Sequence, residues 1–295
     1  MARAISLAPN ANLSAVGSRT PEKAKRFAAE NGFPETVKTY GSYEAVLDDP
    51  NVAQCTCRSP RPSTHGGRWR RRRRRSTLWT GACGMWMHHP RLHKMKELLS
   101  NPHLFGQLKS VHSIFTFLAD SDYLENNIRV KPDLDGLGAL GDIGWYCVRI
   151  ILWAADYELP KTVTALPGAV LNKAGVILSC GASLLWEDGR LATLECSFLA
   201  NLTMDVTVLG TKGTLHVNDF NIPFDETSAS FKFATEDLPQ EALMIKEFAT
   251  LVGSIRDSSS KPDKKWPTIT RKTQLVMDAV KLSVENGCAP VNVVN

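Results

Sequence analysis

The chain has 295 residues, of which 43% are hydrophobic and 22% are charged, and its formal net charge is +5. This composition is typical of a globular protein with one large or two medium domains, and it excludes a disordered tail. No apolar run reaches the roughly 20 residues that a membrane-spanning helix needs, so we expect no membrane partner.

The positive charge is concentrated in one stretch. Nine arginines lie between Arg58 and Arg75 with no acidic residue among them, and Arg70–Arg75 are consecutive. Without this stretch the charge balance is slightly acidic. A basic run normally suggests contact with nucleic acid or a membrane surface, so this one requires a separate explanation.

The cysteines and the first residues bear on location. Seven cysteines without a repeating spacing indicate reduced thiols, and we expect a cytoplasmic protein. The first residues lack a continuous apolar signal core, and an Arg/Ser-type transit peptide is the alternative interpretation.

Residues 1–52 alternate between helix and strand signals. Residues 2–8 predict a helix, 12–18 a short strand, and 42–52 another short helix. Between them, Thr20 is placed to cap a helix over 21–32 that ends at a glycine. This order is the βαβ pattern of an α/β domain, and it is lost over 53–84.

The regular pattern returns after residue 84. Pro90 opens a helix over 91–101, and a strand follows over 106–117. Further strand-like runs lie at 163–171, 176–186, 190–200, 204–210 and 214–220. We expect successive hairpins in a mostly antiparallel sheet, with amphipathic helices at 240–255 and 270–287 covering one face.

Four segments in order carry a family resemblance: AVGSRTPEKAKRFAAENG, YGSYEAVLDDPNV, MWMHHPRLHKMKELL and LGALGDIGWYCVRIILWA. Together they resemble the glucose-fructose oxidoreductase, inositol dehydrogenase and dihydrodiol dehydrogenase family (Gfo/Idh/MocA) of NAD(P)-dependent oxidoreductases. The resemblance covers nearly the whole chain except 53–84. It implies a Rossmann domain for the dinucleotide, then an α/β domain whose open sheet carries the substrate pocket and often the dimer interface.

We therefore expect an α/β fold in two domains. Residues 1–84 would form an incomplete Rossmann-like dinucleotide-binding domain, in which 53–84 are out of frame and poorly ordered. Residues 85–295 would form an α/β domain for substrate binding and dimerisation, with a large, mostly antiparallel open sheet. The implied partners are a small-molecule substrate and a second copy of the chain.

The arginine run is explained by reading frame. Family members continue after a PNV segment with a strand of the type DAVYVPLP, a turn and an Ala-rich helix, whereas this chain has AQCTCRSPRPSTHGGRWRRRRRRST. Back-translation with GC-rich codons, read one base later, restores that strand, turn and alanine run. Trp69 followed by a CGN-coded arginine must then give alanine. The arginines are therefore interpreted as alanine codons read out of register.

Two other interpretations of this stretch are weaker. Arginines on phosphates with Trp69 and Trp79 stacking on bases would make a nucleic-acid binder, whose saturable binding would be lost on replacing Arg70–Arg75. Cysteines and histidines nearby could suggest zinc, but a single Cys-x-Cys pair is poor spacing for a structural site. The residues concerned are Cys55, Cys57, Cys83, His65, His88 and His89. We expect no specific nucleic-acid partner and no metal.

Parts of the cofactor site are missing from the pattern. Rossmann binding needs a strand and a Gly-rich turn at a helix N-terminus, and we expect this sequence to begin inside that helix. The family's Glu-Lys-Pro motif, whose lysine helps hold the nicotinamide ribose, does not occur. The missing strand would lie in the middle of the sheet, so both its neighbours lose a partner. We expect dinucleotide binding to be impaired.

What remains of the cofactor site is the ribose end. Ser18 and Arg19 occupy the position where the family recognises the adenosine ribose, and an arginine there favours NADP over NAD. Lys23, one turn into the next helix, is a weaker companion. The alternative is a solvated arginine ahead of a capped helix.

The candidate catalytic residues are Asp142 and Tyr146. Four residues apart, they would project from one face of a helix. In the family pattern Asp-x-Gly-x-His-x-x-Asp, Asp142 and Gly144 match, Tyr146 stands at the histidine and Arg149 at the last aspartate. The tyrosine version resembles the dihydrodiol dehydrogenase branch, which implies a proton donor or acceptor in hydride transfer. The alternative is a buried tyrosine in a helix core.

Candidate substrate contacts are Trp86, His88 and Arg129, with His89 beside them. For the aromatic residues, packing between domains is an equal alternative. By resemblance the chain is an NADP-dependent oxidoreductase of small polyhydroxy or dihydrodiol substrates, impaired or inactive in this form. The competing hypothesis is a non-catalytic protein that dimerises or binds a partner through its C-terminal sheet.

Overall fold

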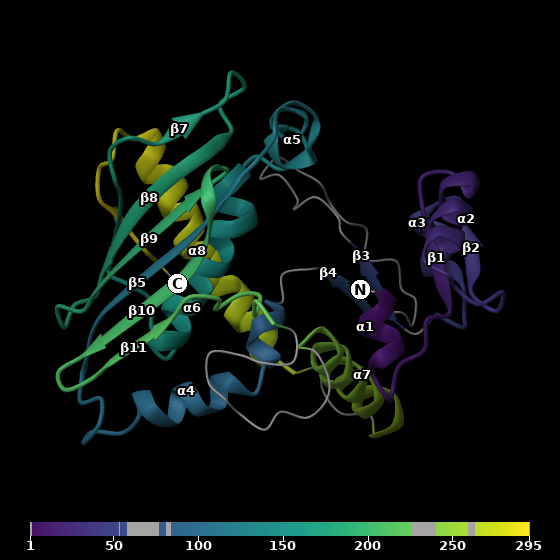
Figure 1. Cartoon of the computed structure of the whole chain (residues 1–295), viewed down its shortest axis with the longest axis horizontal. Helices are drawn as coiled ribbons and strands as arrows, with labels where there is room; N and C mark the ends of the chain where they lie inside the picture. Colours follow the sequence, from purple (N-terminus) through teal and green to yellow (C-terminus); the bar gives the residue numbers. More distant parts are fainter. Residues whose placement is uncertain are drawn as a thin grey trace. The chain divides into compact units, whose positions relative to one another are not determined.

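The computed structural model describes residues 2–52, 54–57, 77–80, 84–225, 240–258 and 263–294. Contacts divide the chain into two units (Figure 1). The N-terminal unit comprises 1–59, 68–83 and 238–262, and the C-terminal unit comprises 60–67, 84–237 and 263–295. Each unit is described by itself.

The first elements of the N-terminal unit confirm the predicted βαβ order. They are α1 (Ala2–Leu7), β1 (Ala15–Gly17), α2 (Pro21–Glu30), β2 (Lys38–Tyr40) and α3 (Tyr43–Asp48). The Thr20 hydroxyl caps α2 by accepting from the amide of Lys23 at 3.3 Å, and Ser42 caps α3 in the same way. Side chains that accept the orphan amides of a first turn start these two short helices.

The described strands of this unit form two separate parallel pairs. β1 pairs with β2, and β3 (Gln54–Cys57) pairs with β4 (Thr77–Thr80). β3 coincides with the strand that the shifted reading frame restores. The rest of 53–83, including Trp69 and the arginine run, lies outside the described residues, as do the side chains of Cys55, Cys57 and Trp79.

The long helix α7 (Gln240–Ser258) belongs to the N-terminal unit. It packs on α1, and the side-chain amide of Asn10 donates to the carbonyl of Lys246 at 3.0 Å and to the Thr250 hydroxyl at 3.3 Å. The helix was predicted, but not this position, because an apolar helix face does not specify its partner.

The C-terminal unit is built on an eight-stranded sheet. Its strands are β5 (Leu108–Leu118), β6 (Thr162–Ala165), β7 (Val170–Leu171), β8 (Ile177–Leu185), β9 (Leu191–Ser197), β10 (Leu199–Gly210), β11 (Thr214–Val217) and β12 (Val291–Asn292). Its helical segments are η1 (Met85–His88), α4 (Arg91–Leu99), α5 (Ser121–Asn126), η2 (Ile128–Val130), η3 (Leu140–Gly144), α6 (Trp145–Ala154) and α8 (Lys265–Glu285).

The strand order is β11-β10-β5-β9-β8-β6-β12, with β7 beside β8. All pairs are antiparallel except β5 with β9, so the sheet is mostly antiparallel as predicted. The expectation that every successive run forms a hairpin was wrong at one place: β5 lies between β9 and β10. Only Phe198 separates these two strands, which is too short for a hairpin loop.

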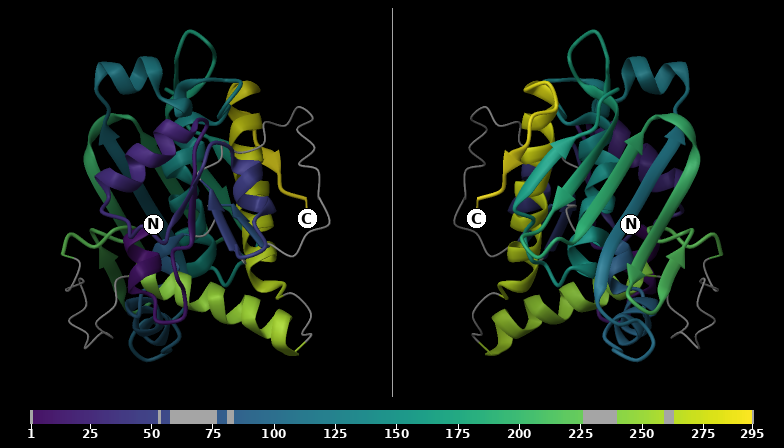
Figure 2. Two further views of the ribbon diagram at one scale, coloured as in Figure 1. Left: turned by 90° about the vertical axis from the view of Figure 1, so that its right-hand side faces the viewer. Right: turned by 90° about the vertical axis from the view of Figure 1, so that its left-hand side faces the viewer.

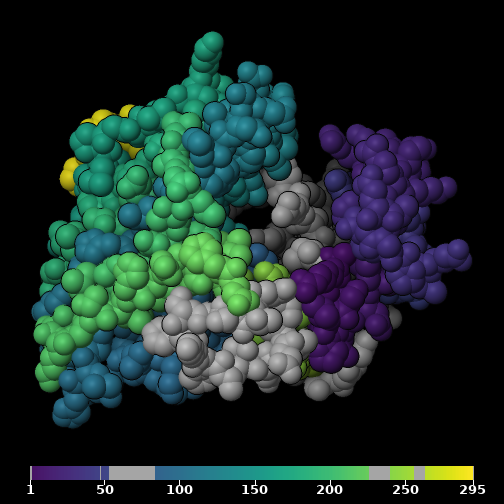
Figure 3. All heavy atoms as spheres, in the orientation of Figure 1, coloured from purple at the N-terminus to yellow at the C-terminus, as the bar shows by residue number. Residues whose placement is uncertain are grey.

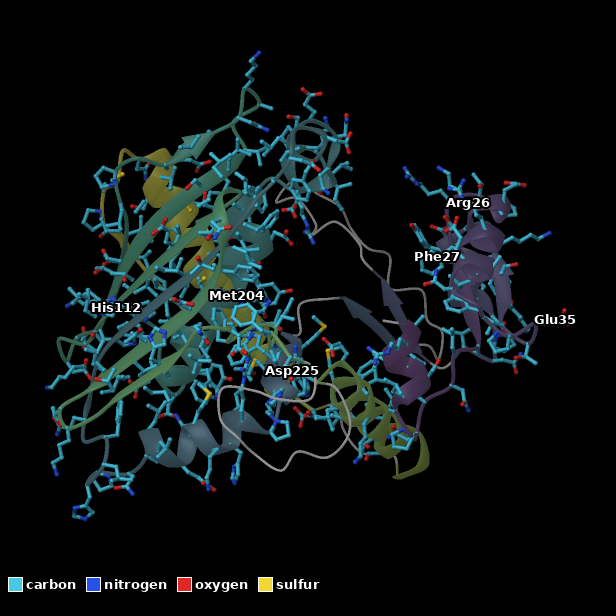
Figure 4. The ribbon with its side chains drawn as sticks, viewed as in Figure 1. Arg26, Phe27, Glu35, His112, Met204 and Asp225 are labelled. Atoms are coloured by element: carbon cyan, nitrogen blue, oxygen red, sulfur yellow. The ribbon has the colours of Figure 1, made fainter. Side chains whose placement is uncertain are left out.

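One face of the sheet is covered and the other carries none of the unit's described helices. α6 and α8 lie behind the strands in the right-hand view of Figure 2. Alternate residues of β8 point into this core, where Cys180, Ala182 and Leu184 are buried. On the outer face, the ring Nδ1 of His112 (labelled in Figure 4) forms a hydrogen bond of 2.8 Å with the Thr193 hydroxyl.

None of the described helices is long and apolar enough to cross a membrane.

Candidate functional site

Asp142 lies at the centre of a charged cluster in the C-terminal unit. Its Oδ1 is 3.2 Å from Nε of Arg129, and its Oδ2 accepts a long hydrogen bond of 3.4 Å from the hydroxyl of Tyr123. Arg129 Nη1 in turn donates to Oδ2 of Asp135. Asp135 is 1% exposed, whereas Asp142 and Arg129 are about one quarter exposed. The structure thus brings together two predicted site residues, Asp142 and Arg129.

Burial and the neighbouring charges determine the protonation states of Tyr123 and Arg129 in this cluster. Burial, reinforced by the charge of Asp142, raises the pKa of Tyr123 well above its usual range. Burial opposes the charge on Arg129, but the carboxylates of Asp142 and Asp135 raise the pKa of its guanidinium. Tyr123 therefore remains a hydrogen-bond donor near neutral pH, and Arg129 remains a cation.

Tyr146 lies in the first turn of α6, where it is half-buried. Its ring packs against Phe115 of β5 at a centroid distance of 5.9 Å. Asp142 belongs to η3, which is a π-helical segment rather than an α-helical one. Because a π-helix has more residues per turn, the spacing of four does not by itself place Asp142 and Tyr146 on one face.

Glycines bring η3 and its approach close to the sheet. A Cβ on Gly144 would lie 3.0 Å from Sγ of Cys196, and one on Gly138, whose φ is +54°, would lie 2.1 Å from the Ile177 carbonyl oxygen. Gly136, Gly138 and Gly141 have the spacing G-x-G-x-x-G, but no strand directly precedes them. They do not form a dinucleotide turn, and Gly138 among them allows the close approach to Ile177.

Trp86 and His88 come from η1. Trp86 has no exposed surface and packs edge-on against Trp153 and Phe220 at centroid distances of 6.4 and 6.0 Å. The ring of His88 stacks on Trp266 of α8 at 4.8 Å. Both side chains therefore have packing roles within the C-terminal unit.

His89 is buried next to a charged arginine. Its Nδ1 accepts from the amide of Arg91 at 3.1 Å. Burial, followed by the charge of Arg91, lowers the pKa of His89 to about 4. The ring is therefore neutral at physiological pH.

Arg149, at the position of the family's last aspartate, is fully buried. It donates to the hydroxyls of Thr273 and Thr270 at 3.3 and 3.5 Å and lies over the ring of Trp145 at 4.7 Å. A cation at this position reverses the charge that the family pattern carries there.

Ser18, Arg19 and Lys23 lie at the end of β1 and the start of α2. The amide of Ser18 donates to the carbonyl of Tyr40 at 3.0 Å, which extends the β1–β2 pairing. Arg19 and Lys23 are exposed. This end of the unit is therefore accessible to an anionic group.

The rest of a dinucleotide site is not seen in the described part of the N-terminal unit. Of its two described strand-to-helix connections, the one after β1 (residues 18–20) contains no glycine, and the one after β2 (residues 41–42) contains one, Gly41. A pyrophosphate cradle needs a Gly-rich turn at this point. Among the described residues of the whole chain, no group of three or more His, Cys, Asp or Glu is arranged to hold a metal ion.

Sequence reasoning missed Tyr123 and Asp135. Neither belongs to a quoted motif. Asp135 is seven residues before Asp142, a helical spacing, but the segment between them is not one helix, and Tyr123 is 19 residues before Asp142. No local signal would have found them, because only the turns between β5 and α6 bring them to Arg129.

Comparisons with known proteins identify a family model and relatives that this chain resembles. A model of the GFO/IDH/MocA C-terminal domain matches residues 92–216. The trans-1,2-dihydrobenzene-1,2-diol dehydrogenase of Xenopus tropicalis is 26% identical over 228 residues, which cover 69% of this chain and 66% of the relative. The chain thus spans just under two thirds of that relative's length.

Solved structures share the fold. GenD2 from gentamicin A biosynthesis, in complex with NAD, has a TM-score of 0.72 at 17% identity, covering 100% of this chain and 92% of GenD2. KijD10, a 3-ketoreductase from Actinomadura kijaniata in complex with TDP-benzene and NADP, has a TM-score of 0.70 at 20% identity, covering 95% of this chain and 92% of KijD10.

A Rossmann-like unit followed by a large open sheet is the architecture of a class of NAD(P)-dependent oxidoreductases. Within that class, residues 92–216 match the C-terminal domain of the Gfo/Idh/MocA family, and the chain is similar in sequence and fold to members of that family.

Proposed function

We propose that this fold serves an NADP-dependent oxidoreductase of small polyhydroxy or dihydrodiol substrates, and that this chain performs the reaction slowly or not at all. The observation that carries the first part is the ion pair of Asp142 and Arg129 next to Tyr123, in a chain similar in sequence to a dihydrodiol dehydrogenase. Carboxylates, guanidinium groups and phenols are hydrogen-bonding groups suited to hydroxyl-rich ligands.

Within this proposal Tyr146 is the proton donor or acceptor, and Asp142 accepts a substrate hydroxyl. Arg129 contributes to the substrate pocket through the part of its guanidinium that remains exposed, His88 belongs to the lining of the pocket, and Trp86, which has no exposed surface, supports it by packing only. A bound nicotinamide would supply the hydride chemistry. Ser18, Arg19 and Lys23 fit the ribose end of that cofactor, and Arg19 favours the 2′-phosphate of NADP.

The two separate strand pairs of the N-terminal unit support impairment. A doubly wound dinucleotide-binding sheet is continuous and places its Gly-rich turn at a central strand. Here β1–β2 and β3–β4 are joined by no described strand. No Gly-rich turn joins a strand to a helix in the described part of this unit, and such a turn supplies the backbone amides that hold the pyrophosphate. The same proposal includes the domain division at residue 84, the frame lesion and the cytoplasmic location. The cytoplasmic location is supported by the free thiols of Cys147, Cys180, Cys196 and Cys288.

NADPH fluorescence enhancement tests this proposal. We expect weak binding that Arg19→Ala weakens further, while Arg26→Ala, on the exposed side of α2 next to Glu30, leaves it unchanged. Tight stoichiometric NADP binding, with turnover abolished by Tyr146→Phe, would contradict impairment. Sequencing the nucleotides around codons 50–86 tests the frame lesion, because the shifted frame must encode VYVPLP.

The second candidate is a non-catalytic protein that dimerises through the sheet. The observation that favours it is the outer sheet face, which carries no helix described for the C-terminal unit and exposes leucines such as Leu118 and Leu199. A discrete dimer on size-exclusion chromatography, together with no NADPH enhancement, would support this candidate over the enzyme.

A further inference from the structure

Arg129 connects two carboxylates that differ in depth. Asp135 is 1% exposed and binds Nη1, whereas Asp142 is 25% exposed and lies 3.2 Å from Nε. Because a guanidinium is a rigid planar fork, fixing one side of it on a buried group fixes the direction of the other. The position of the accessible carboxylate therefore depends on the buried one.

The backbone around Arg129 is held on both sides. The side chain of Asn127 accepts from the amide of Arg129 at 3.0 Å, and the side-chain amide of Asn172 donates to the carbonyl of Val130 at 2.9 Å. The amide of Asp135 donates to the carbonyl of Lys131 at 2.8 Å. These hydrogen bonds therefore hold the main chain in place at both residues of the Arg129–Asp135 pair.

Tyr123 approaches the second oxygen of Asp142 from α5. Its ring packs edge-on against Phe117 at 5.5 Å and against Phe198 at 5.3 Å. These aromatic contacts fix the ring, so that its hydroxyl is aimed before any ligand arrives. Figure 3 shows α5, in blue-teal, on the surface of the C-terminal unit.

We infer that Asp135, Arg129 and Tyr123 are positioning residues, which hold the Asp142 carboxylate in one orientation. Burying Asp135 is costly unless it is paired, and its pairing with Arg129 explains why a charged group lies under an accessible site. The inference deepens the proposed function and rests on it for the ligand, a vicinal diol. It needs no dinucleotide, since all four residues belong to the C-terminal unit.

Diol binding to the full chain tests the role of Arg129. The probe is trans-cyclohexane-1,2-diol, measured by saturation-transfer NMR without dinucleotide. We expect Arg129→Gln to weaken binding about tenfold or more, because it removes a charge-assisted contact, and Arg129→Lys to restore part of the loss. Tyr123→Phe should weaken binding by a smaller factor.

The matched control is Arg190→Gln. Arg190 also joins two carboxylates in the same unit, Asp188 and Glu158, and its side chain is 20% exposed. This variant should lose two ion pairs to carboxylates that are 60% and 55% exposed and leave diol affinity unchanged. Equal affinity in Arg129→Gln and the unsubstituted chain, or an equal loss in Arg190→Gln, would overturn the inference.

A second measurement separates this inference from the proposed function. In protein labelled with ¹⁵N-arginine, the Nε–H resonance that disappears in Arg129→Lys is the Arg129 signal. We expect its hydrogen exchange to accelerate in Asp142→Asn and not in Arg190→Gln. If no diol binds even the unsubstituted chain, the proposed function fails, and unchanged exchange in Asp142→Asn would still overturn the positioning role.

Discussion

Nη1 of Arg91 lies 2.7 Å from Oδ1 of Asp219, which is 128 residues further along the chain. Arg91 has no exposed surface and Asp219 is 4% exposed. Nη2 of the same guanidinium also donates to the carbonyls of Asp219 and Phe220 at 2.7 and 2.6 Å. The first turn of α4 is thereby fastened to the segment that follows β11.

Replacing Asp219 by alanine should destabilise the C-terminal unit strongly. The substitution leaves the Arg91 charge buried without its carboxylate, which costs about 3–5 kcal/mol in proteins. Urea unfolding followed by tryptophan fluorescence measures the change. The control is Glu285→Gln, which breaks an exposed pair with Lys281 and should cost about 1 kcal/mol or less. Equal effects of the two substitutions would show that the buried pair is not structural.

Stability should fall in acid because of His89. The pKa of His89 is lowered from 6.5 to about 4, so between these pH values the unfolded chain binds a proton that the folded chain does not. The folded state should therefore lose stability as pH falls through this window, by roughly 3 kcal/mol in all. His89→Asn keeps an acceptor for the amide of Arg91 and should remove most of this slope. His103→Asn, at an exposed site, should keep it.

Gly138→Ala should be far more harmful than Gly175→Ala. Both glycines have a positive φ, +54° and +80°, so both substitutions introduce backbone strain of order 1 kcal/mol. Only at Gly138 would the new Cβ also meet a main-chain atom, the Ile177 oxygen at 2.1 Å, whereas Gly175 has open space. The difference between the melting temperatures of the two variants measures the effect of the close contact, because both variants share the backbone strain. Equal melting temperatures would contradict the close approach of η3 to β8.

Charges on the outer face of the sheet should dissociate the proposed dimer. Leu118 is 72% exposed and pairs in register with Leu199 at 39%. Replacing both by aspartate would bury like charges against a second copy, while each isolated chain should fold normally. Sedimentation velocity measures the outcome, with Leu104→Asp, at an exposed loop position, as the control. A dimer that survives the double substitution would exclude this face as its interface.

Elements with strong local signals were predicted well. The cap at Thr20, the opening of α4 at Pro90 and the alternation through β8 each depend on a residue and its near neighbours, and each is found. The pairing of β9 with β10 was predicted wrongly, because local alternation does not say which strand lies beside which. The partner of α7 escaped prediction for the same reason.

The candidate site likewise contains residues that local sequence indicated and residues that only the fold brought together. Asp142, Tyr146 and Arg129 were found in the sequence because residue type and family pattern mark them. The sequence by itself indicated the family resemblance and the α/β class, and it led to the hypothesis that residues 53–77 are an out-of-frame strand, turn and helix. Only the tertiary structure decided that Arg129 joins Asp142 to Asp135, that Tyr123 lies on the other oxygen, and that a π-helical segment precedes Tyr146. The physical reason is that these contacts depend on how turns fold back between β5 and α6, and such contacts follow no period along the chain.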